Sequence, residues 1–213
     1  MKIDFVSDVS CPWCAIGLSA LEQALARVAP DITAQLHFQP FELNPKMAAE
    51  GQEIVEHLGQ KYGIDAQQIA ANTEAIRQRG ASVGFNFGIG KRSRIYNTFN
   101  AHRLLHWSGL QGEAAQRALK HALLKAYFTD GQNPSDNAVL LAAANAAGLD
   151  VEAARQVLDR NGFAAEVRQA EAFYQQQGIH SVPAVIINDR HLISGGQPVE
   201  VFEQALRQIA AEA

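Results

Sequence analysis

The chain has 213 residues, a hydrophobic fraction of 47% and a formal net charge of −4. This length suits one large domain, or one domain with a second inserted into it. The weak negative charge argues against a nucleic-acid partner, and no apolar run approaches the roughly 20 residues of a membrane helix. Residues 1–5 show no leader pattern, so we expect a cytoplasmic protein without nucleic-acid or membrane partners.

The first 50 residues show a strand, a helix and a second strand. Residues 3–6 form a short apolar run that is rich in strand formers. Residues 16–25 repeat apolar side chains at helical spacing, and residues 32–41 alternate apolar and polar side chains. A strand–helix–strand order of this kind gives a right-handed crossover between parallel strands.

The middle of the chain shows helical patterns. The segments with helical periodicity are 53–62, 66–80, 96–107, 113–128, 137–147 and 151–158. Glycines separate them, and Asp136 and Asp150 lie where helix caps are useful. Because no strand pattern interrupts this region, we predict an inserted all-α domain over residues 51–161.

Strand patterns return near the C-terminus. A helix is predicted over residues 162–177, a hairpin over 182–187 and 191–194, and a final helix over 198–210. The two outer parts together contain the elements of a thioredoxin fold. We therefore predict an α/β protein in which residues 1–50 and 162–213 form a thioredoxin-like domain with an inserted all-α domain.

The only cysteines, Cys11 and Cys14, lie three residues apart at the predicted junction between strand and helix. A helix N-terminus stabilises a thiolate, which is the attacking species in disulfide exchange. We expect Cys11 to attack and Cys14, under the first turn, to resolve the mixed disulfide. Pro12 fits the first turn of the helix. Trp13 carries no charge, which predicts a less oxidising couple than a histidine at that position.

A metal site is the main structural alternative for the cysteine pair. Zinc normally takes four ligands, and the sequence has no second pair of cysteines. Of the seven histidines, only His102 and His106 share a helical face. We therefore expect a reactive pair and no metal.

Pro183 stands at the start of the apolar run that follows the insertion. A proline there is either an ordinary strand-edge residue or part of a cis Val182–Pro183 bond. In the second case the backbone of Val182 would be exposed beside the cysteines, where an extended substrate could pair with it.

The Cys-Pro-Trp-Cys motif, the helical insertion and Ser-Val-Pro before a hairpin resemble the DsbA family of the thioredoxin superfamily. Residues 10–17 are especially similar to the FrnE-like branch, whose members typically carry Cys-Pro-Trp-Cys followed by an aromatic residue, Ile and Gly. Ala15 departs at the aromatic position. Periplasmic DsbA proteins usually have histidine at the position of Trp13 and carry a leader. The resemblance therefore does not imply their oxidising role in protein secretion.

The resemblance implies a role for each part of the motif. Cys11 and Cys14 correspond to the family's redox pair, and Pro183 corresponds to its cis-proline. On this basis we also expect the substrate to contact Pro12, Trp13 and Val182.

Kappa-class glutathione transferases and 2-hydroxychromene-2-carboxylate isomerases resemble the chain in the same way. They bind glutathione and generally have serine at the position of Cys11. Residues 41–45 and 96–103 look like segments that line the cleft in this wider group, so Asn97 and Asn100 are candidate substrate-binding residues, or else surface or capping residues. Gln197 stands where the transferases often hold the glutathione γ-glutamyl group with an acidic residue.

The sequence thus predicts a thiol–disulfide oxidoreductase that acts on protein or small-molecule thiols and disulfides. It needs no resident cofactor, and glutathione is a candidate redox partner. A glutathione-dependent transferase or isomerase and a redox-regulated chaperone stay open as alternatives. Residues 88–94 combine glycines with basic side chains but lack the phosphate-loop pattern. They form either a solvated loop or a rim contact for anionic thiols.

Overall fold

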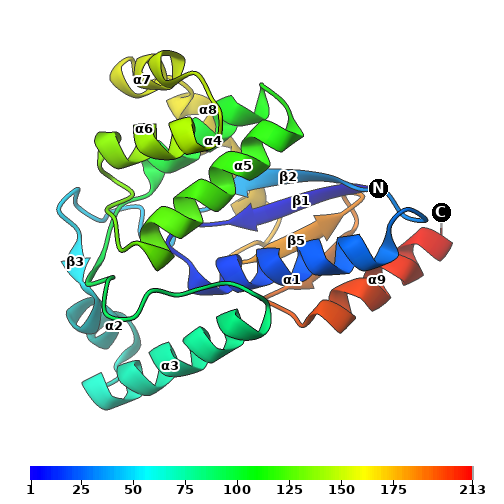
Figure 1. Cartoon of the computed structure of the whole chain (residues 1–213), viewed down its shortest axis with the longest axis horizontal. Coiled ribbons are helices and arrows are strands. Elements are labelled where there is room, and N and C mark those ends of the chain that lie inside the picture. The colour runs from blue at the N-terminus through cyan, green and yellow to red at the C-terminus, as the bar shows by residue number, and fades with distance from the viewer. Residues whose placement is uncertain (213) are drawn as a thin grey trace.

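A four-stranded sheet forms the centre of the structure, a computed structural model that describes residues 1–212 (Figure 1). Its strands, in spatial order, are β2 (Gln35–Pro40), β1 (Lys2–Ser7), β5 (Ala184–Ile187) and β6 (His191–Ser194). β1 is parallel to β2 and antiparallel to β5, which pairs antiparallel with β6. The predicted parallel pairing of the first two strands and the predicted hairpin are both confirmed.

Helices cover both faces of this sheet. α1 (Pro12–Val28) and α9 (Val199–Ala211) pack side by side on one face, and α8 (Ala164–Gln176) lies on the other (Figure 1). Successive side chains of a strand point to opposite faces, so β1 and β5 contribute to two cores. The core shared with α1 and α9 contains Ile3, Phe5, Val185 and Ile187. The core shared with α8 contains Val6, Ala184 and Tyr174.

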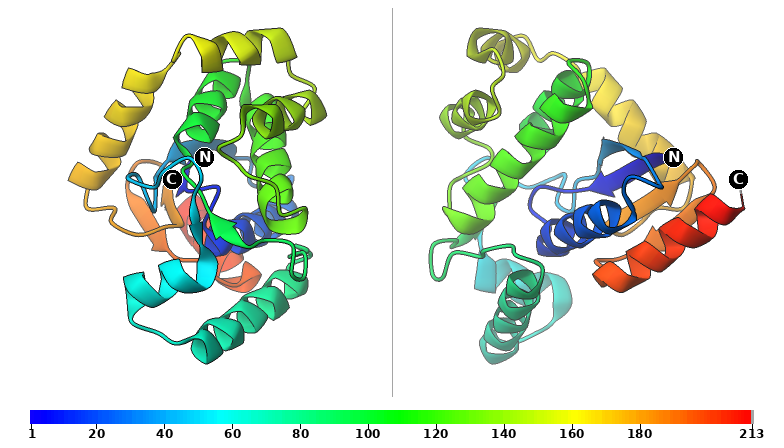
Figure 2. Two further views of the ribbon diagram at one scale, coloured as in Figure 1. Left: turned by 90° about the vertical axis from the view of Figure 1, so that its left-hand side faces the viewer. Right: turned by 45° about the vertical axis from the view of Figure 1, so that its right-hand side comes forward.

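The inserted helices form two groups. The first comprises α2 (Ile54–Tyr62) and α3 (Ala66–Ser82), and the second comprises α4 (Phe99–Gly109), α5 (Glu113–Leu124), the π-helical turn η1 (Lys125–Thr129), α6 (Asn137–Ala146) and α7 (Val151–Asp159). The sheet lies between the two groups in both views of Figure 2. The predicted fold class is confirmed, and the domain boundaries at residues 51 and 161 stay a prediction. Within residues 1–212 no helix is long and apolar enough to cross a membrane.

One expectation for the insertion is wrong, because two short strands interrupt it. β3 (Gln52–Glu53) and β4 (Arg94–Ile95) form an antiparallel ribbon. Each strand has two residues, which is too short for an alternating pattern to be visible in the sequence. The ribbon joins the start of α2 to the segment before α4, and Ile54 N donates to Ser93 O at 3.0 Å beside it.

Side chains from α5 complete the hydrogen bonding at the outer edge of β2. Glu113 Oε1 accepts the N–H of Leu36 at 3.1 Å. Gln116 accepts the N–H of Phe38 at 3.0 Å and donates to the carbonyl oxygen of the same residue at 3.1 Å. An open strand edge would expose these groups for pairing with another chain, so α5 takes the place of a further strand.

Replacing Gln116 by leucine is expected to lower the free energy of unfolding by about 1–3 kcal/mol, because it leaves buried backbone groups of Phe38 without partners. Urea unfolding followed by circular dichroism measures the change. Gln204→Leu, at an exposed position of α9, is the matched control and should change the stability by less than about 0.5 kcal/mol. Equal effects of the two substitutions would contradict the importance of the edge contacts.

Candidate active site

Cys11 lies at the N-terminus of α1, directly after the loop that follows β1. Pro12 is the first helical residue, and the carbonyl oxygen of Cys11 accepts the N–H groups of Cys14 at 3.1 Å and Ala15 at 3.4 Å. Cys11 is therefore the cap residue of the helix, beside the positive end of the helix dipole. This position stabilises the negative charge of a thiolate.

Cys14 lies inside the protein, beneath the first turn. Both cysteines are free thiols; Cys11 is 4% exposed and Cys14 is fully buried. Burial and the hydrogen bond with the Cys11 thiol raise the pKa of Cys14 well above its usual value, and the nearby charge of Lys120 opposes this rise. The difference between the two thiols fits the predicted roles, in which Cys11 attacks and Cys14 resolves.

Val182 and Pro183 border Cys11 from the start of β5. The Val182–Pro183 peptide bond is cis, as predicted, and the Val182 carbonyl oxygen lies 3.7 Å from Cys11 Sγ. Among residues 1–212 the N–H of Val182 has no hydrogen-bond partner. An extended substrate can pair with these backbone groups as an added strand. The structure thus brings Cys11, Cys14, Val182 and Pro183 together.

Two glycines allow α1 to approach the Pro183 segment closely. A Cβ atom on Gly17 would lie 3.1 Å from Pro183 Cγ and 3.2 Å from Gly196 Cα. A Cβ atom on Gly196 would lie 2.9 Å from the carbonyl oxygen of Trp13. Side chains at either position would therefore push the cysteine helix away from the segment that borders the attacking thiol.

Pro12 and Trp13 form the outer surface of the first turn. Trp13 is 42% exposed, whereas Pro12 is half-buried. Both lie next to Cys11 in the chain, so a substrate that reaches its sulfur passes them. Their role in substrate binding stays a prediction.

Lys120 of α5 is a fully buried cation near the thiols. Its Nζ atom donates to Ser7 Oγ at 2.9 Å, and Ser7 Oγ in turn donates to the carbonyl oxygen of Phe5 at 3.4 Å. Burial lowers the pKa of Lys120, while the thiols and Asp8 favour its charged form. The site therefore contains a positive charge that stabilises a thiolate at Cys14.

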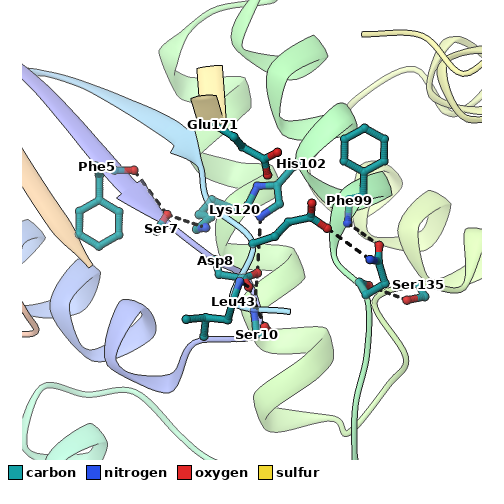
Figure 3. A network of polar contacts seen from close by, with 12 residues as sticks. Phe5, Ser7, Asp8, Ser10, Leu43, Phe99, His102, Lys120, Ser135 and Glu171 are labelled. Atoms are coloured by element: carbon teal, nitrogen blue, oxygen red, sulfur yellow. Dashed lines mark hydrogen bonds and ion pairs between the residues drawn. The ribbon is translucent and has the colours of Figure 1, made fainter. Parts of the chain in front are cut away.

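Asp8 is a buried carboxylate at the centre of a polar network (Figure 3). It accepts the N–H and the hydroxyl of Ser10 at 3.1 and 2.9 Å and the N–H of Leu43 at 2.8 Å. His102 Nε2 lies 3.5 Å from Asp8 Oδ1. Burial opposes ionisation of Asp8, but the contact with His102 and the backbone donors outweigh it and lower the pKa to about 2. Asp8 thereby holds the loop before Cys11 against the segment at Leu43.

The depressed pKa of Asp8 predicts acid lability. A carboxylate whose pKa is lower in the folded state stabilises the fold above its unfolded pKa of 3.8, and this contribution is lost as the pH falls toward 2. We expect a loss of about 2 kcal/mol over this range. Urea titrations between pH 5 and pH 2 measure it. Asp8→Asn should flatten this dependence, and Asp31→Asn, at an exposed position, should leave it unchanged. Equal slopes in all three proteins would contradict the assignment.

Asn97 contacts the segment 41–45, which is also expected from the sequence to line the cleft. Its Oδ1 atom accepts the N–H of Phe99 at 2.9 Å, and its Nδ2 atom approaches Glu42 Oε1 at 3.3 Å and the carbonyl oxygen of Pro45 at 3.5 Å. Glu42 is buried and also pairs with Arg168. Asn97 thus joins the start of α4 to residues 42–45, and its contact with substrate stays a prediction.

Asn100 binds a buried arginine of its own helix, α4. Its Oδ1 atom accepts two N–H groups of Arg103, at 2.9 and 3.2 Å. Arg103 is buried and donates in turn to the carbonyl oxygens of Val157 at 2.8 Å, Gly162 at 3.1 Å and Leu158 at 3.3 Å. The structure therefore shows Asn100 orienting an arginine that binds the end of α7. A role in substrate binding stays a prediction.

Asp8 and Lys120 are not among the site residues predicted from the sequence. Lys120 had a visible signal, because the buried residues of α5 include Gln116, Leu119 and Leu123, and a lysine at position 120 shares their face. Asp8 follows the last residue of β1 directly, and no local pattern distinguishes it from an ordinary loop carboxylate. Among residues 1–212 there is no group of three or more histidine, cysteine and acidic residues that could hold a metal ion.

Both the sequence and the structure of this chain are similar to those of known proteins. The family model of the DSBA-like thioredoxin domain matches residues 2–207. The structure is similar to that of "probable DsbA oxidoreductase SCO1869" from Streptomyces coelicolor, with 33% identity, a TM-score of 0.92, and coverage of 100% of this chain and 91% of that one. The sequence is 25% identical to uncharacterized protein YwbO of Bacillus subtilis (strain 168) over 97% of this chain and 96% of that protein.

A third similarity concerns the fold alone. The cytosolic disulfide reductase DsbM from Pseudomonas aeruginosa, in a structure with GSH, is 15% identical, with a TM-score of 0.68. The match covers 99% of this chain and 100% of that one.

Proposed function

The chain belongs to the DSBA-like thioredoxin domain family, and we propose that it is a thiol–disulfide oxidoreductase that works through Cys11 and Cys14. The observation that carries this proposal is the arrangement of Cys11 at a helix N-terminus, 3.7 Å from the Val182 carbonyl oxygen, with the Cys14 thiol fully buried in the first turn of the same helix. In this proposal the Cys11 thiol attacks the substrate disulfide and the Cys14 thiol displaces the bound substrate.

Reduction of a substrate begins at Cys11. Its thiolate attacks one sulfur of the substrate disulfide, so that a bond forms to Cys11 Sγ and the substrate S–S bond breaks. The leaving thiolate takes a proton from water. The backbone of Val182 holds the substrate segment beside Cys11 during this step.

Cys14 completes the exchange. Its thiol gives up a proton to water, and the resulting thiolate attacks Cys11 Sγ in the mixed disulfide. The Cys11–Cys14 disulfide forms as the bond between Cys11 and the substrate breaks, and the second substrate thiolate leaves and takes a proton from water. Two electrons have then passed to the substrate. The buried charge of Lys120 favours the Cys14 thiolate at this step.

We propose glutathione as the electron source. Two glutathione molecules would reduce the Cys11–Cys14 disulfide and leave as glutathione disulfide, so glutathione is a redox partner rather than a resident cofactor. A reducing role in the cytoplasm is supported by the uncharged Trp13 between the cysteines. It is also supported by the shared fold of a cytosolic disulfide reductase whose structure includes GSH.

The reduction potential of the Cys11–Cys14 couple tests this proposal. We expect a value near about −270 mV, as for thioredoxin, in glutathione buffers followed by the fluorescence of Trp13, with Cys11→Ser as the control. A value near about −120 mV, as for DsbA, would contradict a reducing role. If no dithiol–disulfide transition occurs and glutathione stays bound to Cys11, the proposed function is wrong and a glutathione-dependent transferase or isomerase is favoured.

A further inference from the structure

A second candidate site is a pocket between α2, α3 and the loop before β4. Its volume is about 560 Å³, within the range of about 300–1,000 Å³ that is typical of small-molecule sites. More than half of the lining residues are apolar, and they include Ile54, Ile69, Ala70, Phe87, Ile89 and Phe128. The cysteines, Val182 and Pro183 are not part of this lining, so the pocket is separate from the redox site.

Four charged side chains also line the pocket, and three of them have partners in the protein. Arg77 makes two hydrogen bonds to the Glu74 carboxylate, at 2.6 and 2.7 Å. Glu53 caps α2 by accepting the N–H of Glu56 at 2.8 Å. Among residues 1–212 no carboxylate forms an ion pair with the fourth, Arg92.

Aromatic rings of η1 hold Arg92 in place. Its guanidinium carbon lies 5.2 Å from the ring centroid of Tyr127 and 5.0 Å from that of Phe128. Arg92 is half-buried, so its charge is partly removed from water. A guanidinium held on aromatic faces keeps its N–H groups in a fixed plane, and its fork matches the two oxygens of a carboxylate.

The mouth of the pocket carries an apolar side chain in solvent. Ile89 is 82% exposed and stands between Gly88 and Gly90. Gly88 anchors the loop, because its N–H donates to the Phe128 carbonyl oxygen at 2.9 Å and a Cβ atom there would lie 2.1 Å from the Thr129 carbonyl oxygen. Ile89 is thus held at the rim, where an apolar ligand can cover it.

We propose that this pocket binds an amphipathic monocarboxylate. The apolar part of the ligand packs against Ile54, Ile69 and Phe87, and its carboxylate binds the guanidinium of Arg92. The lining holds two arginines and two glutamates, of which Glu74 is paired with Arg77 and Glu53 accepts the N–H of Glu56. Arg92 is the one cation of the lining without an acidic partner among the described residues, which supports a ligand with a single anionic group.

The test is titration of the full chain with decanoate, followed by calorimetry. We expect saturable one-to-one binding below about 1 mM. Arg92→Gln should weaken it at least about tenfold, because the carboxylate loses its charged partner. Lys91→Gln is the matched control, since this neighbouring cation is exposed and is not part of the pocket lining, and it should change the affinity less than about twofold. Binding of 1-decanol should be as weak as that of decanoate to Arg92→Gln.

A second variant tests the location independently of Arg92. Ala70 is an exposed residue of α3 in the pocket lining, so Ala70→Trp should fill the pocket without disturbing the core. It should abolish decanoate binding and leave disulfide exchange unchanged. Unchanged decanoate binding in Ala70→Trp or in Arg92→Gln would overturn the proposal, as would the absence of binding to the unaltered protein at 1 mM.

Discussion

Cys14→Ser is expected to stop the reaction at the mixed disulfide and to lower turnover at least about 100-fold, since the two thiols act as a unit. Cys11 remains at the N-terminus of α1 beside Val182, so it still attacks a substrate disulfide. No thiol then lies beneath it to displace the bound substrate. Intact-protein mass spectrometry should show one substrate thiol bound to each chain, released by dithiothreitol.

Cys11→Ser provides the matched control, because it removes the attacking thiol and leaves Cys14 buried. It should form no mixed disulfide, since burial raises the pKa of Cys14 and keeps substrates away from its sulfur. A substrate adduct on Cys14 in this variant would reverse the assigned roles. Client binding that is unaffected by the loss of Cys11 would instead favour a chaperone.

Lys120→Met should have the second-largest effect on the reaction. The charge of Lys120 lowers the pKa of Cys14 against burial, so its removal raises that pKa further and reduces the fraction of Cys14 thiolate at neutral pH. We expect resolution of the mixed disulfide to slow by about 10-fold to 100-fold, at or below the lower limit of the roughly 10²–10⁴-fold that a positioned proton-transfer group contributes. Stopped-flow release of a chromogenic thiol measures this rate.

The pH profile separates this role from a structural one. Loss of the charge should move the rising limb of the rate profile to higher pH, because the Cys14 thiolate then forms at higher pH. Lys120→Arg should restore much of the rate. Lys125→Met, which removes an exposed lysine of η1, should leave both rate and profile unchanged. A reduced rate with an unshifted profile would mean that Lys120 acts only through packing.

The order of elements could be read from the sequence where a pattern repeats several times. The alternation over residues 32–41 and the helical spacing over residues 16–25 each reflect one buried face, and β2 and α1 formed there. The strands β3 and β4 could not be predicted, since each pairs only two residues and their contact joins positions far apart in the chain. These two strands form only because the fold of the insertion brings residues 52–53 next to residues 94–95.

The same distinction applies to the site residues: those in short motifs could be predicted from the sequence, and those placed by tertiary contacts could not. Cys11, Cys14 and Pro183 belong to short motifs with a recognisable chemistry, and the structure brings them together. Lys120 reaches the thiols only because α5 packs against β2, which no local pattern specifies. Whether an asparagine amide faces a cleft or a neighbouring backbone is also decided by tertiary contacts, as Asn100 and Arg103 show.

The backbone groups at the edge of β2 find their partners only after α5 has been synthesised. Leu36 and Phe38 leave the ribosome well before Glu113 and Gln116, so the nascent sheet has an uncovered edge until the insertion is made. Such an edge recruits other strands, and nascent chains on neighbouring ribosomes supply them. Self-association therefore competes with folding in the interval before α5 emerges.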